Sequence, residues 1–208
     1  AQRYNAFLIV DDAHGTGHVG PHGRGSPALF GVSDQVDVLT GSLSKGLPGI
    51  GGFIATRHET ARLLRAGANP YIFSASLPPP VLASIIAALD VLEASPQIIE
   101  QLQVKTEYFV TTLRAKGFDL LNTRSSIIPL MTHDEHKAYE LAKALHLRGV
   151  YVNPVTYPAV SRGRARVRIN LSANLTQEEL DYSIETITEV GTDLQLIGTD
   201  GTQRGHDL

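Results

Sequence analysis

The feature that most constrains the fold of this chain is a series of short apolar runs in its first sixty residues. The runs are AFLIVD at 6–11, VDVLTGS at 36–42 and GGFIATR at 51–57. The first has the pattern of a strand covered on both faces of a parallel sheet, and a helix is predicted directly after the third, over 58–67. Strands that alternate with helices favour an α/β fold with a mainly parallel or mixed sheet.

The next segment changes from strands to long helices. NPYIFSASLPPP, at 69–80, is predicted to be a short strand and a turn that opens a helix at the prolines. Five apolar residues of that helix recur at helical spacing, which predicts one buried stripe: Leu82, Ile85, Ile86, Leu89 and Leu92. A second long helix is predicted from Pro96 to about Lys116, where Gly117 ends it.

The rest of the chain predicts a smaller α+β unit. Strands are expected at 125–132, 150–155 and 164–173, with a helix over 135–149, and a last helix begins at the capping box of Thr176 and Glu179. We therefore expect an α/β domain at 1–97, and a connecting helix with a small α+β domain at 98–208. The polar stretch 192–208 is predicted to be a flexible tail.

Composition excludes several classes of protein. The chain has no cysteine, which excludes disulfide scaffolds, thiolate metal sites and cysteine nucleophiles. A net charge of −3 argues against a nucleic-acid partner, and no apolar run approaches the ~20 residues of a membrane span. The N-terminus lacks the basic region and cleavage site of a signal peptide, so we expect a cytoplasmic protein.

Two aspartates and a histidine follow the first apolar run, and four interpretations compete for them. The plainest is that Asp12 caps a turn and His14 is a core histidine. An ATPase acidic box is disfavoured because G-x-x-x-x-G-K-[ST] is absent. A metal site at His14 and His18 is disfavoured because glycine stands where H-E-x-x-H has glutamate, so we predict no metal. The fourth is a carboxylate paired with a heteroaromatic nitrogen.

The stretch GSLSKGLPGIGG, which follows the second apolar run, surrounds one lysine with small residues. The hydroxyls of Ser42 and Ser44 and the backbone N–H groups of such a turn suit a phosphate. A partly desolvated lysine beside a phosphate, such as Lys45, can act as a Schiff-base nucleophile. A surface lysine beside serine is nevertheless common. The functional interpretation of this lysine gains support from the Asp–His pair about thirty residues earlier, at the end of the preceding predicted strand.

A third candidate lies in SRGRARVRIN. Strand alternation places apolar residues on one face and four polar residues on the other: Arg164, Arg166, Arg168 and Asn170. The arginines could be a solvated edge, or one guanidinium could bind a carboxylate through two hydrogen bonds. A Schiff-base lysine, a buried aspartate, phosphate-binding hydroxyls and a carboxylate-binding arginine together indicate pyridoxal 5'-phosphate (PLP) chemistry on an amino acid.

These motifs resemble the C-terminal half of the PLP-dependent α-oxoamine synthases. That family includes 8-amino-7-oxononanoate synthase, 2-amino-3-ketobutyrate CoA ligase, serine palmitoyltransferase and 5-aminolevulinate synthase. The stretches that carry the resemblance are DDAHGTGHVGPHGRG, GSLSK followed by GGFIA, PYIFSASLPP and GRARVRINLSANLT. The resemblance implies a PLP-dependent transferase of fold type I, the aminotransferase-like fold, made of part of the large mainly parallel-sheet domain and the small C-terminal α+β domain.

The resemblance also implies roles for single residues. Lys45 would form the Schiff base with PLP, Asp11 would pair with the pyridine nitrogen, and His14 would lie beside the ring and the substrate. Ser42 and Ser44 would bind the phosphate, and Arg168 would bind the amino-acid carboxylate. Ser74 would reach the phosphate of a partner subunit, which implies a homodimer with the active site at the subunit interface.

The implied activity is an acyltransferase reaction that condenses an amino acid with an acyl thioester, usually with decarboxylation. An aminotransferase, or a non-catalytic fragment that keeps the fold, are the alternatives. The chain departs from the family at four positions. Asp12 replaces the usual glutamate, Ser42 the usual threonine and Leu175 the usual histidine, and Pro48 adds a proline to the glycine loop. It also lacks the family's first half, so we expect a fragment or one piece of a split enzyme, with the missing half upstream or in another chain.

Overall fold

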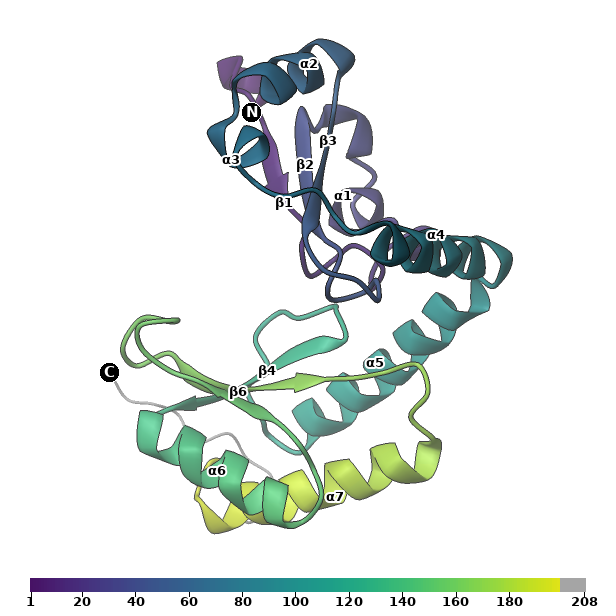
Figure 1. Ribbon diagram of the computed structural model, residues 1–208. Coiled ribbons are helices and arrows are strands. Elements are labelled where there is room, and N and C mark those ends of the chain that lie inside the picture. The colour runs from purple at the N-terminus through teal and green to yellow at the C-terminus, as the bar shows by residue number, and fades with distance from the viewer. Residues whose placement is uncertain (199–208) are drawn as a thin grey trace. The chain divides into compact units, whose positions relative to one another are not determined.

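The computed structural model describes residues 1–198. They fall into two compact units, the first Ala1–Glu100 and the second beginning at Gln101. Figure 1 shows the helices and strands of both units. The division falls three residues after the predicted end of the first domain at residue 97 and lies inside helix α5 (Gln97–Ala115).

The first unit contains a mixed sheet of three strands in the order β1-β2-β3. Strand β1 (Ile9–Asp11) pairs in parallel with β2 (Val38–Ser42), and β2 pairs antiparallel with β3 (Gly52–Thr56). The segment between β1 and β2 holds the short helices η2 (Pro21–Gly23), α1 (Ser26–Leu29) and η3 (Ser33–Gln35), and η1 (Gln2–Tyr4) precedes β1. The predicted mixed sheet is present, with shorter strands than the apolar runs suggested.

The helices of the first unit follow the sheet in the chain. They are α2 (His58–Gly67), α3 (Asn69–Ile72), α4 (Pro79–Ala94) and the start of α5. The predicted short strand at 69–80 is wrong because α3 begins there. Pro70 lies in the first turn of α3, where its missing N–H is not needed and its fixed φ favours a helix.

Two burial predictions for the first unit are also wrong. Of the predicted stripe on α4 only Ile85 is buried, and Leu82, Ile86 and Leu89 are exposed. Strand β1 is not covered on both faces, since it lies at the edge of the described sheet and Ile9 is 62% exposed. Both segments are as apolar as predicted, but the described chain supplies too few elements to cover them.

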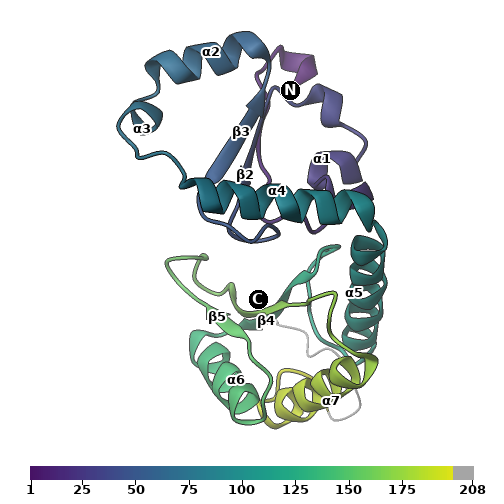
Figure 2. The ribbon, with the colours of Figure 1, turned by 45° about the vertical axis from the view of Figure 1, so that its right-hand side comes forward.

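The second unit contains an antiparallel sheet with helices packed on one face (Figure 2). Its strands are β4 (Ile127–His133), β5 (Asn153–Val155) and β6 (Ala165–Asn170), in the order β4-β6-β5. Helices α6 (Glu135–Leu147) and α7 (Gln177–Asp193) contribute buried residues to one core cluster with β6 and α5. The predicted α+β arrangement and the alternation of β6 are present, with Ala165, Val167 and Ile169 buried.

The start of α7 agrees with the sequence, and the predicted tail only partly does. Thr176 and Glu179 form the expected capping box. The prediction of a flexible tail from residue 192 is wrong for its first part, because α7 continues to Asp193 and Ile197 is buried in the core. The remainder, 199–208, lies outside the described residues. Within residues 1–198 no single helix has the length and apolarity to cross a membrane; only α4 and α5 taken together reach those criteria.

Candidate functional site

The carboxyl ends of two parallel strands bring the first two sequence motifs together. Asp11, the last residue of β1, is in register with Thr40 of β2, and the N–H of Asp12 donates to the Thr40 carbonyl at 2.8 Å. Strand β2 ends two residues later, at Ser42. The predicted aspartate and the predicted lysine loop therefore lie at the carboxyl ends of two neighbouring strands. Open α/β sheets bind their ligands at these strand ends.

Asp11 and Asp12 have different environments although they are adjacent. Asp11 is exposed, and its carboxylate accepts one hydrogen bond, from the Ala13 N–H at 3.0 Å. Asp12 is 3% exposed and accepts from the Ser26 N–H, at 3.1 and 3.2 Å, and from the Thr16 hydroxyl at 3.2 Å. The plain interpretation of Asp12 as a turn-capping residue is confirmed, which leaves Asp11 as the carboxylate available to a ligand.

Asp12 fixes the glycine-rich loop from residue 12 to residue 26. Gly25 has φ +87°, and a Cβ atom there would collide with the Asp12 carboxylate. Gly17 N–H donates to the Gly23 carbonyl at 2.8 Å, which closes the loop on itself. The buried carboxylate thus organises the loop through its backbone, and only glycine fits against it.

We expect Asp12→Ala to lower the unfolding free energy of the chain by about 2 kcal/mol, because the Ser26 N–H and the Thr16 hydroxyl lose a charged acceptor. Denaturant unfolding followed by circular dichroism would measure this change. Asp34→Ala, at an exposed position in η3, is the matched control and should change the free energy by less than about 0.5 kcal/mol. Equal effects of the two substitutions would show that Asp12 does not organise the loop.

The lysine loop is anchored by apolar residues and presents polar ones. Leu43 and Leu47 are buried in a cluster with Ile85 of α4, whereas Ser44 and Lys45 are exposed. The hydroxyls of Ser42 and Ser44 lie 2.9 Å apart, and the Ser44 N–H donates to the Ser42 hydroxyl at 3.2 Å. Buried anchors thus bring the Ser44 hydroxyl and the Lys45 amine to the surface beside the end of β2, and the buried Ser42 hydroxyl lies directly behind that of Ser44.

The glycine-rich loop also supports the lysine loop from behind. A Cβ at Gly46, the residue after the lysine, would meet the Thr16 carbonyl oxygen, the Gly17 Cα and the His18 ring. Two loops thirty residues apart in sequence therefore touch backbone to backbone at Gly17 and Gly46. The sequence showed both sets of glycines but not that they pack against each other.

His14 and His18 differ in burial. His14 is exposed, so the interpretation of it as a core histidine is wrong, while His18 is half-buried. Burial lowers the pKa of His18 below its ordinary value of 6.5, and the nearby His14 lowers it further. Within residues 1–198, no cluster of three or more His, Cys, Asp or Glu side chains could hold a metal ion.

The shifted pKa of His18 predicts a pH-dependent stability. Because the unfolded chain binds a proton at this residue more readily than the folded chain, the neutral side chain contributes stability above pH 6.5. That contribution is lost as the pH falls through 6.5 toward the lowered folded value. We expect His18→Gln to flatten the fall in unfolding free energy between about pH 7 and pH 5. Parallel profiles for the two proteins would contradict the assignment.

Ser74 lies in the connection between α3 and α4 and is exposed. Nearby, Leu77 contacts the position that a Cβ of Gly51 would occupy, so this connection runs against the loop before β3. The role of Ser74 at a partner subunit's phosphate stays a prediction.

Arg168 belongs to the second unit, in the central strand β6. It is in register with Pro129 of β4 and Asn153 of β5, so all three side chains leave the same face of the sheet. Its Nε atom is buried and has no hydrogen-bond partner within residues 1–198. The ion pairs of that part of the chain are His133–Asp119 and Arg148–Glu189, so Arg168 has no acidic partner there.

The other two arginines of this segment, Arg166 in β6 and Arg164 just before it, make different contacts. Arg166 donates from its Nε to the Arg164 carbonyl at 3.0 Å. Burial lowers the pKa of Arg166, and the neighbouring charge of Arg164 lowers it further. Arg164 itself is exposed. Of the three, only Arg168 combines a half-buried position with an unused buried donor, which is the state expected of a group that binds an external carboxylate.

Sequence reasoning missed one residue beside Arg168 and one contact at Leu175. Asn153 lies directly across from it, but a pairing between residues fifteen apart becomes visible only with the register of the sheet. Lys105 of α5 donates to the Ala173 and Leu175 carbonyls at 2.5 and 2.6 Å. The contact at Leu175, where the chain departs from the family pattern, is therefore made by its backbone.

The family model for aminotransferase class I and II matches residues 1–187. Two curated relatives are 8-amino-7-oxononanoate synthase 1 of Bacillus velezensis, 39% identical over 197 residues, and 2-amino-3-ketobutyrate coenzyme A ligase of Escherichia coli, 38% identical over 198 residues. Each match covers 95% of this chain and 50% of the relative, so the chain spans about half the length of these relatives.

A solved structure is similar as well. The serine palmitoyltransferase of S. paucimobilis with a bound PLP–myriocin aldimine superimposes with a TM-score of 0.88 at 31% sequence identity. The match again covers 95% of this chain and 50% of that protein.

Proposed function

This chain belongs to the aminotransferase class I and II family, and from that premise we propose that it is the C-terminal half of a PLP-dependent α-oxoamine synthase. Its fold is the aminotransferase-like fold type I, and the resemblance noted from the sequence motifs is confirmed by the relatives. The proposed reaction is an acyl transfer from an acyl-CoA or an acyl-carrier protein to an amino acid, which gives an α-amino ketone.

One observation carries this proposal above the others. Asp11 and the loop of Lys45 lie at the carboxyl ends of two neighbouring parallel strands, where Asp11 is in register with Thr40. At these strand ends a lysine amine can react with the aldehyde of a pyridine aldehyde, and a carboxylate can pair with its ring nitrogen. Asp11 is exposed there with a single backbone donor, so its carboxylate has room for a further partner.

The residues present fit PLP. Ser42 and Ser44 would bind its phosphate, Lys45 would hold its aldehyde carbon, and Asp11 would pair with its ring nitrogen. When bound, PLP supplies an electron sink that stabilises negative charge on the amino-acid α-carbon. The carboxylate of Asp11 keeps the ring nitrogen protonated, which that sink requires.

The other proposed roles follow from the same arrangement. Arg168 binds the α-carboxylate of the amino acid, and its unused buried Nε supports this role. The Lys45 amine takes the α-proton, and His14 lies beside the ring and the substrate. The α-carbon then bonds to the thioester carbonyl carbon as the C–S bond breaks and the thiol leaves, and loss of carbon dioxide usually accompanies the condensation.

The proposal includes an assembly. Since the chain spans half the length of its relatives, we propose that it is catalytically incomplete without an N-terminal half, supplied upstream or as a separate chain. We further propose a cytoplasmic homodimer with the active site at the subunit interface, where Ser74 reaches the partner subunit's phosphate. The exposed position of Ser74 supports that role.

An aminotransferase is the second candidate, because the matching family model covers aminotransferases of class I and II. It would use the same lysine, aspartate and arginine but transfer the amino group to a keto acid. A chain that keeps the fold without catalysis is the third candidate.

The test uses a completed enzyme, one polypeptide in which this chain follows the N-terminal half of the B. velezensis relative. With PLP, an amino acid and an acyl-CoA, the proposal predicts release of free CoA thiol. Formation of a keto acid without thiol release would favour the aminotransferase. A folded polypeptide that binds no PLP would favour the non-catalytic candidate.

A further inference from the structure

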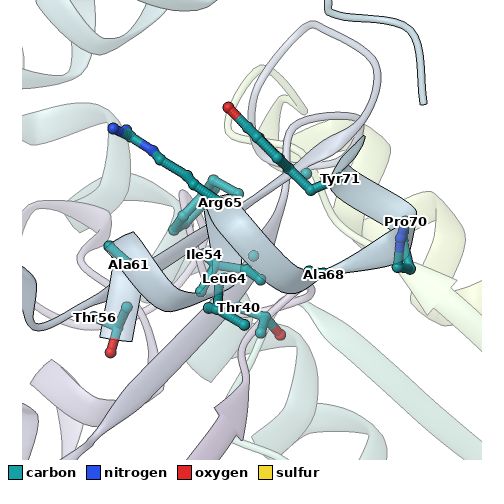
Figure 3. Close-up of a pocket in the computed structure, with 12 residues that line it drawn as sticks. Thr40, Ile54, Thr56, Ala61, Leu64, Arg65, Ala68, Pro70 and Tyr71 are labelled. Carbon is teal, nitrogen blue, oxygen red and sulfur yellow. The ribbon is translucent and has the colours of Figure 1, made fainter. Parts of the chain in front are cut away.

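A pocket of about 620 Å³ in the first unit is poorly suited to a carboxylate. Residues of β2, β3, α2 and α3 line it, and Arg65 is the one charged residue among the described residues of that lining. Figure 3 shows the charged end of Arg65 pointing away from Ile54 and Leu64. The sheet of the second unit, which carries Arg168, offers more polar groups.

Arg168 lies on the face of its sheet that is turned away from the core. Val167 and Ile169, which alternate with it along β6, are buried in the core cluster. Because β6 is the central strand, Arg168 has a direct neighbour on each side, Pro129 of β4 and Asn153 of β5. A proline side chain has no hydrogen-bonding group, so Asn153 is the cross-strand neighbour that can bond to Arg168 or to its ligand.

The remaining neighbours on this face do not duplicate Asn153. Arg166 is in register with Met131 and Val155, whose side chains are apolar, and its Nε donates to a backbone carbonyl at 3.0 Å. Asn170, two residues further along β6, is exposed and lies beyond the end of the pairing with β5. Asn153 therefore has a position beside Arg168 that no other polar residue of these paired strands shares.

The hydrogen-bonding groups of the two residues complement each other. The Nε of Arg168 is buried and has no acceptor within residues 1–198. Asn153 is half-buried, and its side-chain amide makes no hydrogen bond in the same part of the chain. Directly opposite residues of an antiparallel pair have Cβ atoms about 4.5–5.5 Å apart, so the amide oxygen is within reach of the Nε. The amide also has two N–H donors, which suit a carboxylate oxygen.

We propose that Asn153 is the second residue of the carboxylate site. Its amide oxygen accepts from the Arg168 Nε and orients the guanidinium, and its NH₂ group donates to the α-carboxylate of the amino acid. An uncharged side chain is needed here, because an acidic one would occupy Arg168 internally. This inference rests on the proposed function and deepens it, since it names the residue that keeps Arg168 both oriented and available.

The test measures steady-state kinetics of the completed enzyme. Asn153→Ala should raise the KM for the amino acid about tenfold, as expected for a lost hydrogen bond to a charged group, with the KM for the acyl thioester and the PLP absorbance unchanged. Asn153→Asp, which has nearly the same shape, should raise it further because its carboxylate pairs with Arg168 and repels the substrate. Asn122, an exposed asparagine between α5 and β4, is the matched control, and its Ala and Asp variants should change either KM less than twofold.

A double-mutant cycle separates this role from a merely structural one. In the Arg168→Ala background, Asn153→Ala should raise the KM for the amino acid by less than a further threefold, because the two side chains act on one carboxylate. Circular dichroism checks that each variant folds.

The inference is overturned if Asn153→Ala leaves the KM for the amino acid unchanged, if it raises both KM values equally, or if the Asn122 variants have the same effect. It is also overturned if Asn153→Asp has no larger effect than Asn153→Ala, or if the effects of Asn153→Ala and Arg168→Ala multiply fully. These outcomes leave the proposed function intact, because the wild-type enzyme still binds PLP and releases thiol. A folded wild-type enzyme that does neither would overturn both.

Discussion

Replacing Lys45 with alanine in the completed enzyme is expected to abolish the visible absorbance of lysine-bound PLP and to lower the condensation rate by about 10³-fold or more. The absorbance is lost because the variant has no amine at the edge where β1 and β2 end. The rate should fall because, in the proposed reaction, the same amine removes the α-proton, and a positioned acid or base typically contributes 10²- to 10⁴-fold. Absorbance spectra and thiol release measure the two effects.

The matched control is Lys116→Ala, which removes a lysine from the second unit. Because Lys116 follows α5 and belongs to no proposed site, both the absorbance and the rate should be retained. The assignment of Lys45 would be contradicted if its alanine variant kept the absorbance, or if Lys116→Ala lost it to the same extent.

Arg168→Ala is expected to raise the KM for the amino acid by roughly 30- to 150-fold while leaving the KM for the acyl thioester nearly unchanged. The physical reason is the loss of charge-assisted hydrogen bonds to the substrate carboxylate, about 2–3 kcal/mol. Arg168 has an unused buried Nε and no acidic partner within residues 1–198, so no internal contact competes with the substrate. Steady-state kinetics with each substrate varied in turn separates the two KM values.

Arg164, which directly precedes β6, is the control for nearby charge. It is exposed, and its backbone carbonyl, which accepts from Arg166, remains in Arg164→Ala. We therefore expect a change of less than threefold in either KM. Equal increases in Arg164→Ala and Arg168→Ala would mean that the face attracts the substrate only through its net charge, and the specific role of Arg168 would be wrong.

The sequence predicted what depends on local pattern. The alternation in β6, the capping box at Thr176 and the placement of Asp11 and Lys45 after neighbouring strands each depend on a few consecutive residues. Such features need only the period of a strand or the chemistry of a helix end.

The wrong burial predictions share one physical cause, which is that burial depends on contacts with residues distant in the sequence. The apolar spacing on α4 and in β1 was identified correctly, but burial depends on partners, and the described chain does not cover either segment. The same is true of the site. Neither the packing of Gly17 against Gly46 nor the position of Asn153 opposite Arg168 follows from any local pattern.

The helix at 69–72 was missed for a different reason. The segment that begins with Asn69 and Pro70 was predicted to be a short strand, although proline is well suited to the first turn of a helix. Only burial distinguishes Asp11, the carboxylate available to a ligand, from Asp12, which organises the loop. Asp11 is exposed, whereas Asp12 is buried and accepts hydrogen bonds from Ser26 and Thr16.

The most direct test of the central claim is to identify the lysine that holds PLP. The completed enzyme is incubated with PLP and reduced with borohydride, which fixes the cofactor to its lysine, and the labelled peptide is then sequenced by mass spectrometry. The chain contains five lysines: Lys45, Lys105, Lys116, Lys137 and Lys143. We predict stoichiometric labelling of Lys45 alone among them. Labelling of another lysine, or none in a folded enzyme, would contradict the proposed function.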